Sequence, residues 1–105
     1  MLLGWHYMDY YAGTYAQNQY LASLGYVVLS VNYRLGIGYG FDFHRVVDGW
    51  SRGASEYRDI KAAGEFLRTL PQVDGARIGI YGGSYGGFLT AMALSRDSEV
   101  TAIAA

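Results

Sequence analysis

Residues 82–87 read Gly-Gly-Ser-Tyr-Gly-Gly and contain the pattern G-x-S-x-G, formed by Gly82, Ser84 and Gly86. This pattern is typical of a nucleophilic serine held on a sharp turn between a strand and a helix. Such a turn strains the backbone of the serine, and its neighbours two places away must be very small because two backbone segments nearly touch there. The pattern predicts acyl transfer, with Ser84 as the nucleophile. The backbone N–H of Tyr85, at the helix N-terminus, is the expected oxyanion donor.

The same glycine-rich turn, which Gly83 and Gly87 complete, has two other interpretations. One is a plain turn in which Ser84 caps the next helix, and the strand–turn–helix context favours catalysis over it. The other is a phosphate cradle. A P-loop requires a lysine where Phe88 stands, and residues 36–40 place the third glycine of a dinucleotide fingerprint one residue early with no helix after it. Both phosphate-binding patterns are therefore poor matches.

The elements that would position Ser84 alternate between helix and strand. Apolar spacing predicts helices over 14–24, 55–70 and 86–94, with Gly25 after the first and Ser55 capping the second. Nearly continuous apolar runs predict strands buried on both faces at 26–33 and 77–81, and a third strand begins at 100–105. Strands separated by helices predict an α/β fold with a parallel sheet, so the loop 34–54 and the turn at Ser84 should leave the same sheet edge.

Composition bounds the classes of protein that remain. The chain has 105 residues, is 51% hydrophobic and 16% charged, and carries a net charge of −1, which excludes a disordered chain and argues against nucleic acid as a partner. It has no cysteine, so it holds no disulfide, thiolate metal site or thiol nucleophile. No targeting or membrane-spanning segment is visible, and a cytoplasmic location is favoured.

Several segments together resemble the prolyl oligopeptidase family of serine peptidases, in its dipeptidyl-aminopeptidase and acylaminoacyl-peptidase branch. The segments that carry the resemblance are 20–28, 31–34, 38–40, 73–79 and 82–89. The resemblance implies an α/β-hydrolase fold, cleavage of short peptides, and no metal or organic cofactor. It places Ser84 at the nucleophile and Tyr85 at the oxyanion donor, with the Tyr85 side chain bordering the S1 pocket.

The chain also departs from that family. The triad of this fold runs in the order Ser, Asp, His, but Asp97 and Glu99 are the acids after Ser84 and no histidine follows it. The oxyanion strand, which lies between the two predicted strands in the family, would precede residue 1, and the β-propeller domain is missing. We therefore expect residues 1–105 to be part of a single catalytic domain, inactive alone, whose partners are a peptide substrate, the rest of that domain and a β-propeller.

Without the central strand, the segments 26–33 and 77–81 are expected either to pair with each other or to leave a gap. Two other functions stay open: an esterase or other acyl hydrolase of the same fold, and a non-catalytic remnant that acts as an interaction module. His6, near Asp9, has no set of metal ligands around it, and His44 is expected to pack within its loop. The tyrosines at 7, 10, 11, 15 and 20 are expected to pack the first helix against the sheet rather than to line a cleft.

Overall fold

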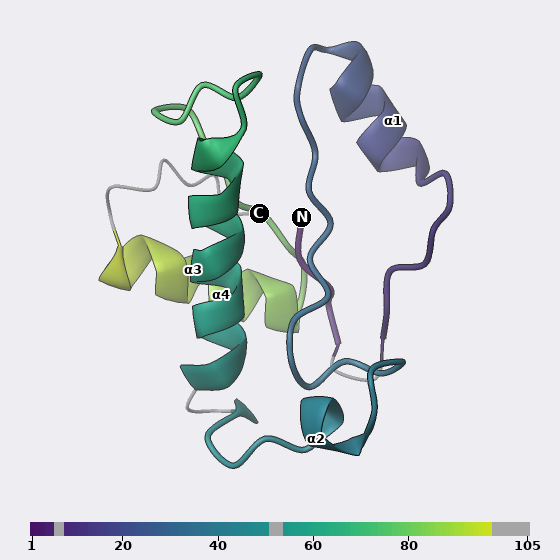
Figure 1. Ribbon diagram of the computed structural model, residues 1–105, viewed down its shortest axis with the longest axis vertical. Helices are drawn as coiled ribbons and strands as arrows, with labels where there is room; N and C mark the ends of the chain where they lie inside the picture. Colours follow the sequence, from purple (N-terminus) through teal and green to yellow (C-terminus); the bar gives the residue numbers. More distant parts are fainter. Residues whose placement is uncertain (6–7, 51–53, 98–105) are drawn as a thin grey trace.

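The computed structural model describes residues 1–5, 8–50 and 54–97, and four helices lie within them (Figure 1). They are α1 (Ala16–Ser23), α2 (Phe41–His44), α3 (Ala54–Thr69) and α4 (Tyr85–Arg96). Helices α1, α3 and α4 confirm the three predicted from apolar spacing. Helix α2 is a short addition inside the segment predicted to be a loop. Several sequence predictions lie outside the described residues: the strand at 100–105, and the roles of His6, Tyr7 and Glu99.

The predicted α/β-hydrolase fold with a parallel sheet is wrong for the described residues, whose regular secondary structure is helical and which contain no strand. Their only β pairing is two isolated parallel bridges, from Leu2 to Val31 and from Leu2 to Gly82. Segments 26–33 and 77–81 do not pair with each other. Instead residues 1–3 lie between them, where Leu2 N–H donates to the Tyr81 carbonyl (3.0 Å) and Val31 N–H to the Met1 carbonyl (3.2 Å).

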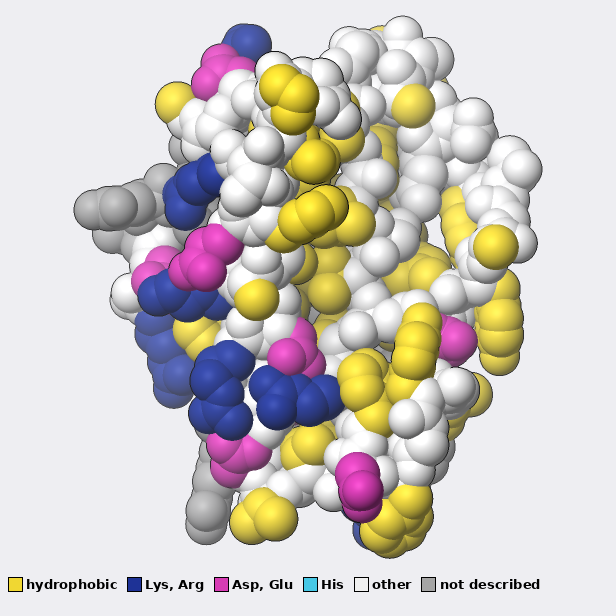
Figure 2. Space-filling view, viewed as in Figure 1, with side chains coloured by type: hydrophobic (Ala, Val, Ile, Leu, Met, Phe, Trp, Pro, Cys, Tyr) yellow, Lys and Arg dark blue, Asp and Glu magenta, His cyan; other side chains and the backbone are white. Residues whose placement is uncertain are grey.

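The predicted strands fail because a strand needs a partner along several residues, and in the described part of the chain the two bridges of Leu2 are the only pairing. Next to Met1, where residues 1–3 no longer lie between the two segments, these segments border a groove of about 840 Å³. The run predicted to be buried on both faces has Tyr26 62% exposed and Val27 47% exposed. Figure 2 shows hydrophobic side chains along the hollowed face between α1 and α3, with charged side chains gathered over α3. The apolar, β-branched segment 26–33 is thus an extended chain that belongs to no sheet.

The core surrounds the N-terminal segment. Leu2 is 4% exposed and Leu3 is 2% exposed, and they pack in one cluster with side chains from the extended segments, α3 and α4. The remaining members of the cluster are Tyr33, Tyr57, Ile60, Ile80, Leu89 and Ala93. The Tyr33 hydroxyl, fully buried, donates to the Leu3 carbonyl at 2.7 Å. The segment leading to Gly4 is therefore fixed directly beside the start of α4.

Helix α1 does not pack as predicted, because none of its residues is buried. Of the tyrosines expected to hold it, Tyr11 and Tyr20 are exposed, whereas Tyr10 is partly buried against the core and stacks edge-on with Tyr15. Gly25 has φ +90, so the predicted left-handed end of this helix is confirmed. No helix among the described residues is long and apolar enough to cross a membrane.

The segment 34–50 is tied to α3 by ion pairs. The Arg34 guanidinium binds the Asp59 carboxylate with Nη2–Oδ1 at 2.7 Å, and the Arg34 N–H donates to the same carboxylate at 2.8 Å. Ser55, predicted as the cap of this helix, lies inside its first turn and donates its hydroxyl to Asp48 instead. Arg34 and Asp48 thus hold the loop against α3.

The connection between α3 and the end of α4 predicts a pH-dependent stability. The Tyr57 hydroxyl donates to the Asp97 carboxylate, and Lys61 Nζ lies 3.0 Å from it. The Tyr57 hydrogen bond, then Lys61, lowers the pKa of Asp97 below 3.8, so this contribution is lost as pH falls through that lowered pKa. Burial, then Asp97, raises the pKa of Tyr57 to about 12, so the contribution is also lost as pH rises from 10 through 12.

Urea unfolding followed between pH 2.5 and 7 checks the acid side of this prediction. We expect the midpoint to fall with pH less steeply in Asp97→Asn and in Tyr57→Phe than in the parent chain. An unchanged slope in both variants would show that the contact contributes nothing.

Candidate active site

The candidate nucleophile stands on a strained turn. Ser84 has φ 53 and ψ −121, a backbone conformation that side-chain-bearing residues rarely adopt, and α4 begins at the next residue. The residue is exposed, and its hydroxyl makes no capping hydrogen bond to the helix. The plain capping role therefore has no support in the geometry.

At Gly82 and Gly86, the two glycines of the pattern, other backbone atoms leave no room for a side chain. A Cβ on Gly82 would lie 2.8 Å from the Gly86 carbonyl carbon, and a Cβ on Gly86 would lie 2.7 Å from the Leu3 carbonyl oxygen. Gly83 has open space around its Cβ position. Gly87 N–H donates to the Gly83 carbonyl at 3.2 Å. Gly82 and Gly86 thus fulfil a steric requirement that Gly83 does not share.

The N–H predicted as the oxyanion donor has a partner in this structure. Tyr85 N–H donates to the Gly4 carbonyl at 3.2 Å. Gly4 lies directly against the turn, since a Cβ added to it would be 3.3 Å from the Gly83 carbonyl oxygen and 3.7 Å from Ser84 Cβ. A substrate carbonyl that used this N–H would therefore have to displace the Gly4 carbonyl.

The Tyr85 side chain makes a polar contact that sequence reasoning missed. Its hydroxyl donates to the Glu56 carboxylate and lies 2.7 Å from the Trp50 carbonyl oxygen. Burial, then the Glu56 hydrogen bond, raises the pKa of Tyr85. Sequence reasoning assigned Glu56 no role in the site. Its place four residues before Ile60, on the apolar stripe of the helix, was the signal for a buried acid.

The described acid after Ser84, Asp97, and the described histidine before it, His44, make their contacts elsewhere. Asp97 is bound to Tyr57 and Lys61. His44 Nδ1 lies 2.9 Å from the Leu35 carbonyl and 3.2 Å from the Gly36 carbonyl, in agreement with a packing role within its loop. Among the described residues, no group of three His, Cys, Asp or Glu side chains is placed to hold a metal ion.

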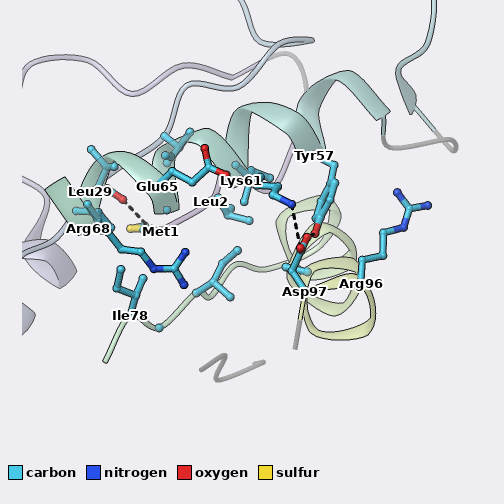
Figure 3. Close-up of a pocket in the computed structure, with 18 residues that line it drawn as sticks. Met1, Leu2, Leu29, Tyr57, Lys61, Glu65, Arg68, Ile78, Arg96 and Asp97 are labelled. Carbon is cyan, nitrogen blue, oxygen red and sulfur yellow. Dashed lines mark hydrogen bonds and ion pairs between the residues drawn. The ribbon is translucent and has the colours of Figure 1, made fainter. Parts of the chain in front are cut away.

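A cavity of about 460 Å³ lies apart from this turn (Figure 3). It is enclosed by α3, the end of α4 and the extended segments, with Lys61 and Asp97 paired at its edge. None of residues 82–87 lines it. The candidate site is therefore the exposed turn at Ser84 and not the cavity.

The sequence pattern of the prolyl oligopeptidase family matches residues 12–105, which include the whole turn and the helix after it. The chain belongs to the prolyl oligopeptidase family. The predicted resemblance is thereby confirmed.

Individual relatives within the family agree. The chain is 43% identical over 85 residues to a probable dipeptidyl-aminopeptidase B of Grosmannia clavigera, covering 81% of this chain and 9% of that protein. It is 42% identical over 82 residues to the uncharacterized peptidase YuxL of Bacillus subtilis, covering 76% and 12%. It is 39% identical over 71 residues to an acylamino-acid-releasing enzyme of Arabidopsis thaliana, covering 68% and 9%. The chain thus spans about a tenth of these prolyl oligopeptidase relatives, and no solved structure matches it significantly.

Proposed function

We propose that this chain carries the nucleophile of a serine peptidase that hydrolyses short peptides by acyl transfer, and that residues 1–105 form part of a single catalytic domain. The observation that carries the proposal is Ser84, an exposed serine with φ 53 and no capping bond at the start of α4. Backbone strain of this kind clusters at active sites and persists only where the surroundings impose it. Membership of a peptidase family supports the same chemistry.

In the proposed reaction Ser84 Oγ attacks the scissile carbonyl carbon and gives its proton to a histidine acting as general base. Tyr85 N–H stabilises the resulting oxyanion once the Gly4 carbonyl has moved away. The C–N bond then breaks, the leaving amine takes the proton from the histidine, and water hydrolyses the acyl-serine. Both histidines of the chain, His6 and His44, precede Ser84. We propose that the histidine and its orienting carboxylate come from outside these 105 residues.

A fluorophosphonate probe tests this proposal on the complete polypeptide encoded by the gene. The serine oxygen displaces fluoride from phosphorus only if a base activates it, so we expect one labelled peptide, the one that contains Ser84. No labelling at Ser84 would overturn the proposal and favour a non-catalytic remnant. Among substrates, dipeptidyl and acylaminoacyl p-nitroanilides represent the two activities named for the relatives, and preferred hydrolysis of simple esters would favour an esterase.

A further inference from the structure

Glu56 is a fully buried carboxylate beside the candidate active site. It lies in the first turn of α3 with 0% exposure, and its Oε1 accepts the hydrogen bond of the Tyr85 hydroxyl. Its Oε2 is also buried and has no hydrogen-bond partner in the described part of the chain. The backbone closes over it, because a Cβ on Gly49 would lie 3.3 Å from Oε2 and 2.9 Å from Leu35 Cδ2.

A carboxylate in this place is costly by general physical chemistry. Removing a charged or polar group from water costs several kcal/mol unless it is paired, and an apolar side chain of similar size would fill the space without that cost. The N-terminal end of α3 and the nearby Arg34, whose own pKa Glu56 helps to raise, offset part of it. Packing alone therefore does not account for Glu56, and within the described residues its side-chain hydrogen bond to another element is the one to Tyr85.

Tyr85 links two backbone positions with positive φ, Ser84 and Trp50. It follows Ser84 directly, and its hydroxyl reaches the carbonyl of Trp50, which has φ 66. Its ring is held between Tyr33, at a centroid distance of 6.5 Å, and Phe88, at 5.5 Å. The ring contacts limit where the side chain lies, and the hydroxyl contact determines how far it reaches. A contact that fixes the hydroxyl therefore restrains Tyr85, the residue whose N–H follows Ser84.

We propose that Glu56 is a positioning residue for the Ser84 turn: by holding the Tyr85 hydroxyl, it aligns the Ser84–Tyr85 peptide, whose N–H is the oxyanion donor. The inference rests on the proposed function. Glu56 itself touches neither the nucleophile nor the substrate in this role. It acts on the reaction of Ser84 more than on the binding of substrate, because the group that it aligns is used in the transition state.

The test compares variants that remove the hydrogen-bond acceptor at Glu56 with variants that change the core or another hydroxyl–carboxylate contact. Glu56→Met keeps an unbranched side chain of similar length and replaces the carboxylate with a thioether, which is only a weak acceptor, and Glu56→Gln keeps an oxygen acceptor. Ile60→Val is a core control on the same helix, and Tyr57→Phe removes an equivalent hydroxyl–carboxylate contact away from the turn. In the complete polypeptide we measure fluorophosphonate labelling as a saturation constant and a maximal rate. Misalignment of a reacting group by about 1 Å costs up to about 100-fold in rate.

We expect Glu56→Met to lower the maximal rate about tenfold or more with the saturation constant changed less than about twofold. Glu56→Gln should restore most of the rate, and both controls should match the parent protein. Equal rates for Glu56→Met and the parent, or equal losses in Ile60→Val, would overturn the proposal. Tyrosine ¹³Cζ spectra of the 105-residue chain, assigned with Tyr85→Phe, give an independent readout. The chemical shift of the Tyr85 resonance should change in Glu56→Met. An unchanged chemical shift would refute the contact between Tyr85 and Glu56, and this result does not depend on whether the fluorophosphonate probe reacts with the parent protein.

Discussion

Gly86→Ala is expected to disrupt the Ser84 turn and to destabilise the whole chain. The added Cβ would lie 2.7 Å from the Leu3 carbonyl oxygen and 3.0 Å from the Leu2 carbonyl oxygen. Both are backbone atoms, so neither can move like a flexible side chain. Moving them would break the Leu2 N–H bond to Tyr81 and the Tyr85 N–H bond to Gly4. We expect a loss of about 3 kcal/mol in the free energy of unfolding, a large fraction of the stability of a small domain.

Urea unfolding of the 105-residue chain, followed by circular dichroism, measures this loss. Two glycines serve as matched controls because a Cβ at either would meet no atom within 4 Å: Gly83, in the same turn, and Gly64, inside α3. Gly64→Ala should raise the free energy of unfolding by about 0.5–1 kcal/mol, since alanine is the better helix former. If Gly86→Ala unfolds at the same urea concentration as Gly83→Ala, the crowding at Gly86 does not exist.

The helices were predictable because their information is local. Apolar spacing located α3 to within about one residue at each end, and Gly25 marked the end of α1. The information that decides whether a helix is buried is not local. Helix α1 has apolar residues at helical spacing and yet buries none of them, because burial depends on a partner surface that its own sequence does not encode.

The strands were not predictable for the same physical reason. The β-branched run 26–33 favours extended backbone, but a sheet forms only where two such segments meet along several residues. Here Leu2 separates them, and two bridges replace the expected ladder. The expectation that the segments either pair or leave a gap omitted a third outcome, which is that the first residues of the chain lie between them.

In the candidate site, too, features set by the local sequence were predictable and contacts between distant residues were not. The strained backbone of Ser84 and the crowding of Gly82 against Gly86 were predictable, because a short turn constrains its own glycines. The contact between Tyr85 and Glu56 was not, because it joins residues 29 positions apart through the packing of α3 beside α4. The Gly4 carbonyl at the Tyr85 N–H likewise depends on where the N-terminal segment lies.

Ser84→Gly is expected to stabilise the protein while it removes the proposed activity. With φ 53 and ψ −121, Ser84 occupies a backbone region that costs a residue with a side chain about 1–3 kcal/mol and glycine almost nothing. Glycine also has more conformational freedom in the unfolded chain, which lowers the gain in the free energy of unfolding by about 0.4–1 kcal/mol. The hydroxyl contributes no capping bond that the substitution would lose. We therefore expect the free energy of unfolding to rise by about 1 kcal/mol.

Ser84→Ala separates the two effects, since alanine keeps the backbone strain and loses only the hydroxyl. Its stability should stay within about 0.5 kcal/mol of the parent, whereas labelling and hydrolysis by the complete polypeptide should fall at least about 1,000-fold in both variants. Urea unfolding gives the first quantity and p-nitroanilide hydrolysis the second. A Ser84→Gly variant no more stable than Ser84→Ala would show that the turn is not strained. Full hydrolysis by Ser84→Ala would show that another residue is the nucleophile. If the free energy of unfolding rises when glycine replaces Ser84, the chain keeps a strained serine at a cost to its stability, and the proposed reaction explains that cost.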